Sequence, residues 1–294
     1  ILGKVYHRDT HDSRDRFGQE VAFLKYLKSI AVKESPALIS QDRTAGVVCI
    51  DWIEGADFDS PLASSESYWK QCFSFLKKIQ VGKNSIEAKS LPEGSEAAFS
   101  LRAHLALLQN RRDYWYAHNQ TIPEKVRSLL MTELDEEYKS LAKELISHPD
   151  FNKELEPDEK IISPSDFGLH NAKLVEDEQL AFFDFEYAGW DDPAKTIADF
   201  FAQPRFPAPF EKVENLISTF SEIFSSSVMD RLLRRLPLVN RIIRLKWCYI
   251  LLNDFHPAFS KRRILSGKKL NSVKQTLFLM NKFINTNTLL ANSI

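Results

Sequence analysis

The spacing of hydrophobic positions changes along the chain and predicts a mixed α and β protein. Short apolar or weakly alternating runs at residues 1–7, 37–40 and 46–53 are typical of β-strands. Between the first two runs, residues 17–30 carry apolar side chains at helical spacing. We therefore expect a small sheet with one helix at the start of the chain.

Farther along, the hydrophobic spacing is mainly helical. The ranges with this spacing are 65–80, 94–119, 123–148, 210–224, 228–255 and 270–283. Ser64 or Ser65 is a suitable cap for the first of these helices, and Pro237 should break the fifth. Residues 189–194 are expected to form a turn into one more helix, which runs to Phe201. The larger part of the chain is thus predicted to be a helical body.

A β-hairpin is predicted within this helical body. An apolar-leaning run, a polar turn and a second apolar run follow one another at 172–175, 176–179 and 180–185. A turn centred on residues 177–178 would pair Val175 with Leu180. Counting back along the strands, Asn171 would then face Asp184 at the open end of the hairpin.

Three polar side chains at this open end suggest chemistry. Asp166, Asn171 and Asp184 would supply carboxylate and carboxamide oxygens, which suit Mg²⁺ because this ion keeps places for water and phosphate oxygens. A further carboxylate nearby can accept the proton of an attacking hydroxyl, as phosphoryl transfer requires. Taken singly, Asp166 is more often a turn or cap residue, Asn171 a turn former and Asp184 the end of a strand, so the prediction depends on their combination.

The motif SPSDFGLHN, followed by DFEYAGWDDPAK and ADF, resembles the aminoglycoside phosphotransferase and choline kinase families. It is especially similar to poorly characterised bacterial members of that superfamily, which has the protein-kinase-like fold. The resemblance identifies Asp166 with the catalytic-loop aspartate and Asn171 with the metal-binding asparagine. Asp184 matches the aspartate of the kinase D-F-G motif, whereas the letters DFG at 166–168 stand in the catalytic-loop position.

The resemblance also extends to the N-terminal strand and helix. Lys4 and Glu20 match the ion pair that positions ATP phosphates in kinases, although both could instead be solvated surface charges. The glycine-rich loop of these families is not found after Ile1. Because the chain begins within a strand pattern, we expect the natural protein to have earlier residues.

Residues 51–55 (DWIEG) resemble the hinge between the two lobes of these enzymes. By that resemblance the carbonyl of Asp51 and the amide of Ile53 would hydrogen-bond adenine, with Ile50 at the back of its pocket. The alternative is an ordinary buried strand followed by a turn.

Two positions depart from the family pattern. Pro164 stands where the family usually has the histidine of H-x-D, which is mainly a scaffold residue. Thr196 stands where the relatives have an aspartate that steadies the catalytic loop, and Asp199 follows one helical turn later. Two alternatives stay open: Asp199 substitutes for that aspartate, or the helix is shifted. The presence of the metal-site and catalytic-loop residues argues against an inactive pseudokinase.

The phosphate acceptor is not identified by the sequence. Aromatic and acidic residues after Asp184 resemble the quaternary-ammonium site of choline kinases, and similar residues also line sugar sites. A later helix lines the acceptor pocket in the family, although its residues here could equally serve core or capping roles. The candidate acceptor contacts are Glu186, Tyr187, Trp190, Trp247, Asn253 and Asp254.

Composition adds few constraints. With 44% hydrophobic and 27% charged residues, the chain has ordinary globular composition, and its net charge of −1 gives no argument for nucleic acid or an anionic membrane as partner. No apolar run is long enough to span a membrane. Cys49, Cys72 and Cys248 lie in apolar runs, which favours buried thiols and a reduced, cytoplasmic location.

The sequence as a whole predicts an α+β, protein-kinase-like, two-lobed fold. Residues 1–53 would form an incomplete β-rich N-lobe, and residues 54–294 a helical C-lobe that carries the catalytic loop and the metal-binding hairpin. We expect transfer of the γ-phosphate of ATP, or another nucleoside triphosphate, with Mg²⁺ as cofactor. The acceptor would be a hydroxyl of a sugar, an aminoglycoside-like or a choline-like molecule, and the enzyme a monomer or homodimer.

Two other functions remain open. The departures at Pro164 and Thr196 allow a catalytically weak nucleotide-binding module, which would bind ATP without turnover. Alternatively, Asp166 and Asp184 could serve a metal-dependent phosphate-ester hydrolase that has no need of nucleotide.

Overall fold

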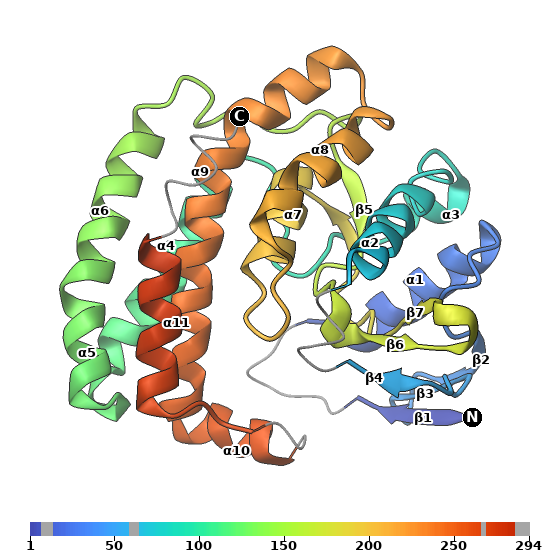
Figure 1. Cartoon of the computed structure of the whole chain (residues 1–294), viewed down its shortest axis with the longest axis horizontal. Coiled ribbons are helices and arrows are strands. Elements are labelled where there is room, and N and C mark those ends of the chain that lie inside the picture. Colours follow the sequence, from blue (N-terminus) through green and yellow to red (C-terminus); the bar gives the residue numbers. More distant parts are fainter. Residues whose placement is uncertain (7–13, 59–64, 266–268, 286–294) are drawn as a thin grey trace. The chain divides into compact units, whose positions relative to one another are not determined.

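The computed structural model describes residues 1–6, 14–58, 65–265 and 269–285. Contacts divide the chain into two compact units (Figure 1). The first unit comprises residues 1–97 and 156–229, and the second comprises 98–155 and 230–294. The predicted lobe boundary after residue 53 lies inside the first unit and stays a prediction. Ser64, one of the two expected helix caps, lies outside the described residues.

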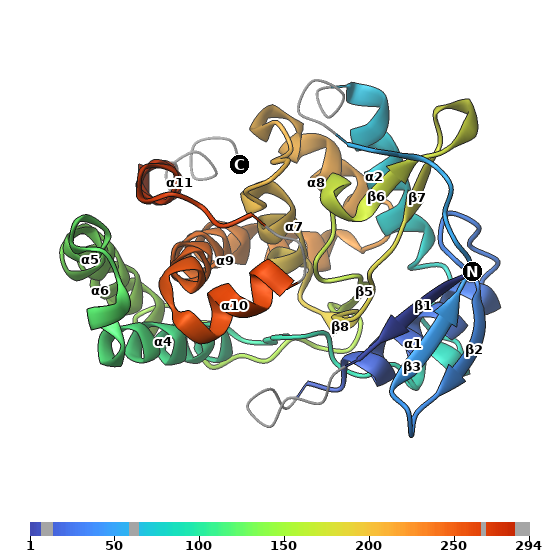
Figure 2. The ribbon, with the colours of Figure 1, turned by 90° about the horizontal axis from the view of Figure 1, so that it is seen from below.

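The first unit begins with an antiparallel sheet covered by a helix (Figure 2). Strands β1 (Leu2–Val5), β2 (Leu38–Asp42) and β3 (Val47–Ile50) lie in the order β1-β3-β2. Helix α1 (Arg16–Ser29) contacts β2 and β3, and Asp15 caps its start by accepting from the Gly18 amide. The expected strand at 46–53 is shorter than predicted, because residues 51–54 have no regular structure.

Two further small sheets carry the central part of the first unit. Strand β4 (Ala56–Asp57) pairs with β6 (Ala172–Leu174), which pairs with β7 (Leu180–Phe182). Strand β5 (Ile161–Ser163) pairs with β8 (Gly189–Asp191). Together with the helices, these sheets confirm the predicted α+β class. The predicted turn at 189–194 is partly wrong, because its first three residues form β8.

The predicted hairpin is present, but its register was wrong by one residue. Leu180 pairs with Leu174 and not with Val175. The Val175 amide donates to the Gln179 carbonyl at 2.9 Å, so three residues lie between them, in the short 3-10 turn Glu176–Glu178. The expected turn at residues 176–179 would have paired Val175 with Leu180. The shorter turn, Glu176–Glu178, instead places Asn171 beside Phe183, whose amide donates to the Asn171 carbonyl at 3.0 Å.

Aromatic side chains form the core beneath the hairpin. Phe75 lies 4.5 Å from Phe182 and 5.5 Å from Phe167, measured between ring centroids. Phe23 of α1 lies 4.9 Å from Phe185 in the same way. All five rings are at most 8% exposed, which removes a large apolar area from water. Because Phe167 and Phe185 directly follow Asp166 and Asp184, this core fixes the chain on one side of both aspartates.

In the part of the first unit that the structure describes, four more α-helices lie wholly within its bounds. They are α2 (Glu66–Lys78), α3 (Ile86–Lys89), α7 (Pro193–Ala202) and α8 (Val213–Ser221). Helix α8 contacts both α2 and α7 (Figure 1). Helix α7 begins as expected for proline in a first turn, with Asp192 as its cap. Short 3-10 turns lie at Leu169–Asn171 and Phe210–Lys212.

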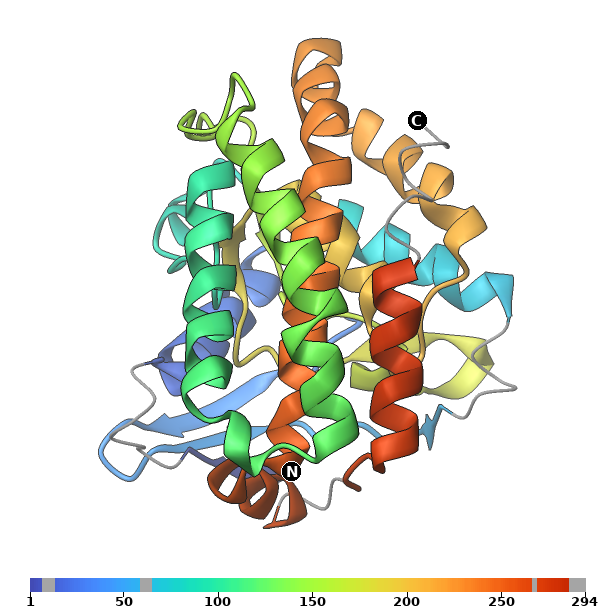
Figure 3. The ribbon, with the colours of Figure 1, turned by 90° about the vertical axis from the view of Figure 1, so that its left-hand side faces the viewer.

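Among the described residues of the second unit, all regular secondary structure is helical. The helices are α4 (Leu101–Ala117), α5 (Glu124–Met131), α6 (Glu133–Ile146), α9 (Ser226–Leu251), α10 (Pro257–Leu265) and α11 (Val273–Asn285). Short 3-10 turns lie at Asn119–Thr121 and Leu252–Phe255. Helix α9 begins in the first unit and continues into the second. Figure 3 shows α4, α6, α9 and α11 as long helices.

Three predicted helices in this part were wrong in detail. The helix expected at 94–119 begins at Leu101, because Pro92 and Gly94 bond the backbone of β8 instead. The range 123–148 is two helices, which meet at Thr132, where ψ is −96°. Pro237 does not break α9. The apolar residues around Pro237 are buried, and their burial offsets a cost of roughly 3 kcal/mol for proline inside a helix.

Two further observations concern the whole described chain. Cys72 and Cys248 are buried and Cys49 is half-buried, and all three thiols are free. Among the described helices, none combines the length and the apolar composition that crossing a membrane requires.

Asp135 of α6 gives the second unit a predicted acid sensitivity. Burial acts to raise the pKa of Asp135, but hydrogen bonds from Lys139 and Arg112 outweigh it and lower the pKa from 3.8 to about 2. A carboxyl with a lowered folded-state pKa stabilises the fold above its unfolded pKa, and this stabilisation is lost as the pH falls through the folded value. Urea denaturation between about pH 5 and pH 2 should therefore show a steeper loss of stability in wild type than in Asp135→Asn. Parallel pH profiles would contradict this assignment.

Candidate active site

The candidate catalytic loop runs from the end of β5 to the start of β6. Its Asp166 side chain is 38% exposed, and the Oδ1 atom lies 2.9 Å from Nε2 of His170. The Asn171 side-chain amide donates from Nδ2 to the Asp166 carbonyl at 2.8 Å. Gly168, with φ of 154°, permits the backbone to turn between them. The loop thus brings Asp166 and Asn171 together, as their spacing predicted.

His170 is a site residue that the sequence did not single out. Its side chain is 10% exposed, and its Nδ1 atom has no hydrogen-bond partner among the described residues. Its other ring nitrogen contacts Asp166. A histidine four residues after the aspartate was visible in the sequence, but only the folded loop shows that the two side chains meet.

Asp184 follows the hairpin in a strained conformation. Its φ is 67°, in the left-handed region that non-glycine residues rarely adopt. Such strain costs about 1–3 kcal/mol and concentrates at functional sites. The Asp184 side chain is 39% exposed, and its Oδ1 atom accepts from Lys4 Nζ at 2.8 Å.

Lys4 joins the N-terminal strand to α1 and to Asp184. Its ammonium lies 2.6 Å from Glu20 Oε2 and 2.8 Å from Asp184 Oδ1. Glu20 is fully buried, and its Oε1 accepts from the Phe185 amide at 3.3 Å. The pair expected between Lys4 and Glu20 is therefore formed, and Asp184 is a further partner that the sequence did not predict.

Burial and the neighbouring charges act in opposite directions on the pKa values of Lys4 and Glu20. Burial acts to lower the pKa of Lys4, but the Asp184 and Glu20 carboxylates outweigh it and raise the pKa above its ordinary value. Burial also raises the pKa of Glu20, although the Lys4 ammonium works in the other direction. The Lys4 side chain is thus held as a cation beside Asp184.

Asn171 and Asp184 have oxygen atoms that fit a metal ion. Since Nδ2 of Asn171 donates to the loop, its Oδ1 is left as an acceptor, and no described residue donates to it. The Oδ2 atom of Asp184 likewise accepts from no described residue. No group of three or more His, Cys, Asp or Glu that could hold a metal exists within the described ranges. Few protein ligands, all oxygen, fit Mg²⁺ shared with phosphate.

The segment expected to be the hinge leaves β3 after Ile50, which is buried. The Asp51 amide donates to the Ala37 carbonyl at 3.0 Å. The Asp51 carbonyl and the Ile53 amide bond no residue that the structure describes. These are the two groups that the resemblance assigns to adenine, and they are open to a ligand.

The candidate acceptor contacts after Asp184 are already engaged. Guanidinium groups of Arg14 and Arg16 lie 5.2 and 5.3 Å from the Tyr187 ring centroid. Arg16 also pairs with Glu186 at 3.4 Å. The Trp190 indole donates to the Ala88 carbonyl at 2.9 Å. Cations of the chain itself thus lie against Tyr187, where the resemblance allowed either a quaternary ammonium or a sugar hydroxyl.

The other acceptor candidates belong to the second unit. Asp254 is buried, and its carboxylate is bonded by Arg263 and by the backbone and side-chain amides of Asn271. The Trp247 ring lies under the Lys246 ammonium at 5.8 Å, and Asn253 is half-buried. Within its unit, Asp254 therefore joins two segments of the chain.

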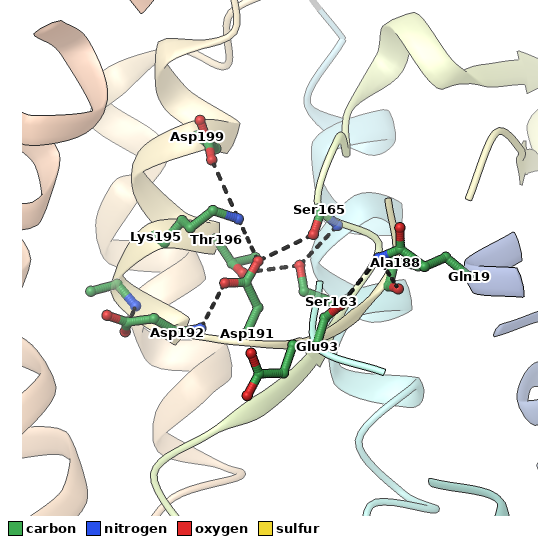
Figure 4. Close-up of polar contacts among 11 residues, drawn as sticks. Gln19, Glu93, Ser163, Ser165, Ala188, Asp191, Asp192, Lys195, Thr196 and Asp199 are labelled. Carbon is green, nitrogen blue, oxygen red and sulfur yellow. Dashed lines mark hydrogen bonds and ion pairs between the residues drawn. The ribbon is translucent and has the colours of Figure 1, made fainter. Parts of the chain in front are cut away.

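One of the two departures from the family pattern, Thr196, contacts the strand that leads into the catalytic loop (Figure 4). Thr196 donates to Ser163 Oγ at 3.0 Å. Asp199 lies 3.9 Å from the Lys195 ammonium, and Asp191 accepts from Ser165 Oγ at 3.2 Å. Asp191 and Lys195 were missed, because side chains so far from the loop in sequence meet it only through the pairing of β5 with β8.

A cavity of about 520 Å³ lies elsewhere on α1. It is lined by Phe17, Val21, Lys25 and Arg43, among others, and contains none of the candidate residues. The candidate active site is therefore defined by its polar groups and not by this cavity.

The fold and site were compared with known proteins. No protein-family model matches the chain, and no curated protein sequence matches it. Solved structures do match it in fold. A choline/ethanolamine kinase family protein from Mesorhizobium loti is 16% identical with a TM-score of 0.54, covering 95% of this chain and 79% of its own. Choline kinase LicA from Streptococcus pneumoniae is 14% identical with a TM-score of 0.58, covering 98% and 85%.

An aminoglycoside phosphotransferase, APH(2'')-Ib in its ADP-bound form, is 12% identical with a TM-score of 0.56, covering 98% of this chain and 87% of its own. At these identities the likeness shows the fold, and it confirms the protein-kinase-like fold that the sequence predicted.

The buried pair of Lys4 and Glu20 leads to a stability prediction. Lys4→Met should lower the free energy of unfolding by about 3 kcal/mol, because it leaves the Glu20 carboxylate buried without a cation. The double variant Lys4→Met/Glu20→Gln should regain most of this loss. Lys33→Met, which removes an exposed lysine, is the matched control for urea denaturation.

The same variant has a predicted pH dependence. Without Lys4, the raised pKa of Glu20 should rise further. A carboxyl with a raised folded-state pKa stabilises the fold below its unfolded pKa, and this stabilisation is lost as the pH rises through the folded value. The destabilisation in Lys4→Met should therefore be larger at about pH 8 than at about pH 5. Equal losses at both pH values would show that Glu20 does not depend on Lys4.

Proposed function

Since the chain has the protein-kinase-like fold of choline kinases and aminoglycoside phosphotransferases, we propose that it is an ATP-dependent small-molecule kinase. The reaction is transfer of the γ-phosphate to a hydroxyl of the acceptor. The observation that carries the proposal is the contact of Lys4 with both Glu20 and Asp184, which sets a fixed cation beside an available carboxylate oxygen. A purely structural role would not require that oxygen to stay open.

The catalytic loop supplies the groups that act on the acceptor. Asp166 accepts the proton of the attacking hydroxyl and orients its oxygen toward the phosphate. His170 contacts the same carboxylate and restricts its direction. Since the phosphate itself is reactive once positioned, most of the rate gain comes from alignment and charge neutralisation.

The nucleotide is held by groups of the first unit. Asn171 Oδ1 and Asp184 Oδ2 would hold Mg²⁺, which neutralises phosphate charge when bound. The Lys4 ammonium binds phosphate oxygens on the same side. The carbonyl of Asp51 and the amide of Ile53 bond the base, with Ile50 behind it. Another nucleoside triphosphate would meet the same backbone groups.

The acceptor is a small molecule with a hydroxyl group. The chain passes from Glu186 directly to β8, so the described residues leave no long segment of the kind that binds protein substrates. The structural neighbours include enzymes named for choline, ethanolamine and aminoglycosides. Because Arg14 and Arg16 already lie on Tyr187, we favour an acceptor recognised through hydroxyl or amine groups over one that needs an open aromatic cage. Glu186 and Trp190, with Trp247, Asn253 and Asp254, stay candidate contacts.

Nucleotide binding gives the first test of this proposal. Isothermal titration calorimetry should detect ATP binding that requires Mg²⁺ in wild type, and Asp184→Ala should weaken it at least about tenfold, because it loses a metal ligand. Asn171→Ala should show a similar loss. Glu176→Gln, at the exposed hairpin tip, is the control and should bind as wild type does.

The outcomes of this test separate the alternatives. Absence of ATP binding in the wild-type protein would contradict the kinase proposal. Hydrolysis of a phosphate ester without nucleotide would then favour a metal-dependent hydrolase that uses Asp166 and Asp184.

Turnover gives a second and independent test. Asp166→Asn should bind Mg²⁺-ATP as wild type does, yet release ADP about 100-fold or more slowly in a coupled assay with candidate acceptors, since the amide cannot accept the proton. A wild-type protein that binds ATP but matches Asp166→Asn in turnover would be a nucleotide-binding module and not an enzyme.

A further inference from the structure

Ser165, the residue immediately before Asp166, is held in a strained conformation. Its φ is 63°, and the Asp166 amide donates to the Pro164 carbonyl at 2.9 Å. Ser165 is thus the central residue of a γ-turn of positive φ, the rare and strained form of this turn. Such a residue costs about 1–3 kcal/mol and persists only where its surroundings hold it.

The amide and the hydroxyl of Ser165 both donate hydrogen bonds to residues behind the loop (Figure 4). Its amide donates to Ser163 Oγ at 3.1 Å, and its hydroxyl donates to Asp191 Oδ2 at 3.2 Å. Ser163 Oγ also accepts from Thr196 at 3.0 Å. The turn is therefore tied to β5, to β8 and to α7 at once.

The acceptor of the Ser165 hydroxyl belongs to a buried ion pair. Asp191 is 0% and Lys195 3% exposed, and the Lys195 ammonium bonds the same Oδ2 atom that Ser165 contacts. Asp191 Oδ1 accepts from the Asp192 amide at 2.9 Å, which fixes the carboxylate plane. One oxygen atom thus receives a hydrogen bond from the strained loop and another from a buried cation.

Gly94 lies against the contact between the Ser165 hydroxyl and the Asp191 carboxylate. A Cβ atom at this position would lie 2.7 Å from Ser165 Oγ and 3.3 Å from Asp191 Oδ2. The amide of Gly94 donates to the Trp190 carbonyl at 2.8 Å, which holds the segment in place. A side chain at this position would crowd the Ser165 hydroxyl, so glycine suits the close approach of this segment.

We propose that Ser165, Asp191 and Lys195 form a positioning relay for the candidate base, which takes over the task of the family aspartate that Thr196 replaces. Asp191 holds Ser165 in the strained turn, and Lys195 holds Asp191. The turn then sets the backbone from which the Asp166 side chain projects. The inference rests on the proposed function, since it assigns what the turn positions the base for.

A role in overall stability explains this arrangement less well. A buried ion pair is weak support for a fold, because removing two charges from water offsets much of their attraction. An apolar pair of the same volume would serve the core of α7 at least as well. It could not bond the Ser165 hydroxyl, and the turn would lose its tether.

The test uses Ser165→Ala and Ser165→Gly in the full chain. Both variants remove the hydroxyl, and glycine also relieves the strain of positive φ. Ser221→Ala is the matched control, because it removes a serine hydroxyl that bonds a backbone carbonyl on the exposed end of α8. The readouts are amide hydrogen exchange of residues 161–171 without nucleotide, and kcat and KM for ATP in ADP release.

We expect both Ser165 variants to raise exchange of the loop amides and to lower kcat about tenfold or more, with KM for ATP within about twofold of wild type. The Ser221→Ala control should match wild type. Loop exchange equal to wild type in both variants would overturn the relay. If wild type shows no turnover, the proposed function fails, and hydrogen exchange alone still decides whether the relay holds the turn.

The ion pair has its own test. Asp191→Asn/Lys195→Met removes both charges together, so that neither is left buried alone, and thermal denaturation shows whether the variant is folded. The relay predicts the same faster loop exchange as in Ser165→Ala. A folded double variant with wild-type loop exchange would remove Asp191 and Lys195 from the proposal, and an unfolded one would show that the pair serves the fold.

Discussion

The position of one ammonium group organises the candidate active site. Lys4 on β1 contacts Glu20 on α1 and Asp184 after β7, so a single cation joins three elements that are far apart in sequence. Neither carboxylate could be held close to the other without this charge between them, because like charges at such distances repel. The contact links α1 to the sheet and to the strained backbone at Asp184.

An ion pair beside a residue with a strained backbone also occurs behind the catalytic loop. There Lys195 lies beside Asp191, and the strained residue is Ser165. In both places a residue with positive φ is a candidate functional aspartate or directly precedes one. In the first place a lysine bonds the carboxylate of that residue, Asp184. In the second a lysine bonds the carboxylate of Asp191, which Ser165 contacts. The aromatic core around Phe75 supports both segments from below, since Phe167 and Phe185 directly follow the two aspartates.

Much of this arrangement could be predicted from the sequence because it is local. Hydrophobic spacing gave α1 and the hairpin, and the match of Lys4 and Glu20 to a kinase ion pair anticipated their contact. The predicted hairpin register was wrong because Asp177 and Glu178 adopt positive φ. Neither residue is a glycine, the residue that would have indicated such a turn in the sequence. Pro237 stays within α9 because burial on both sides outweighs its missing hydrogen bond, and tertiary burial is not visible in a local pattern. Asp191 reaches the loop only through strand pairing.

We propose that Asn171 and Asp184 hold the metal of a nucleotide bound at residues 50–53, with Asp166 facing the transferred phosphate. A crystal structure of the protein with Mg²⁺ and a non-hydrolysable ATP analogue tests it most directly. We expect a metal at about 2.1 Å from Asn171 Oδ1 and an Asp184 oxygen, with adenine bonded to the Asp51 carbonyl and the Ile53 amide. A nucleotide bound elsewhere, or a metal that contacts neither side chain, would contradict it.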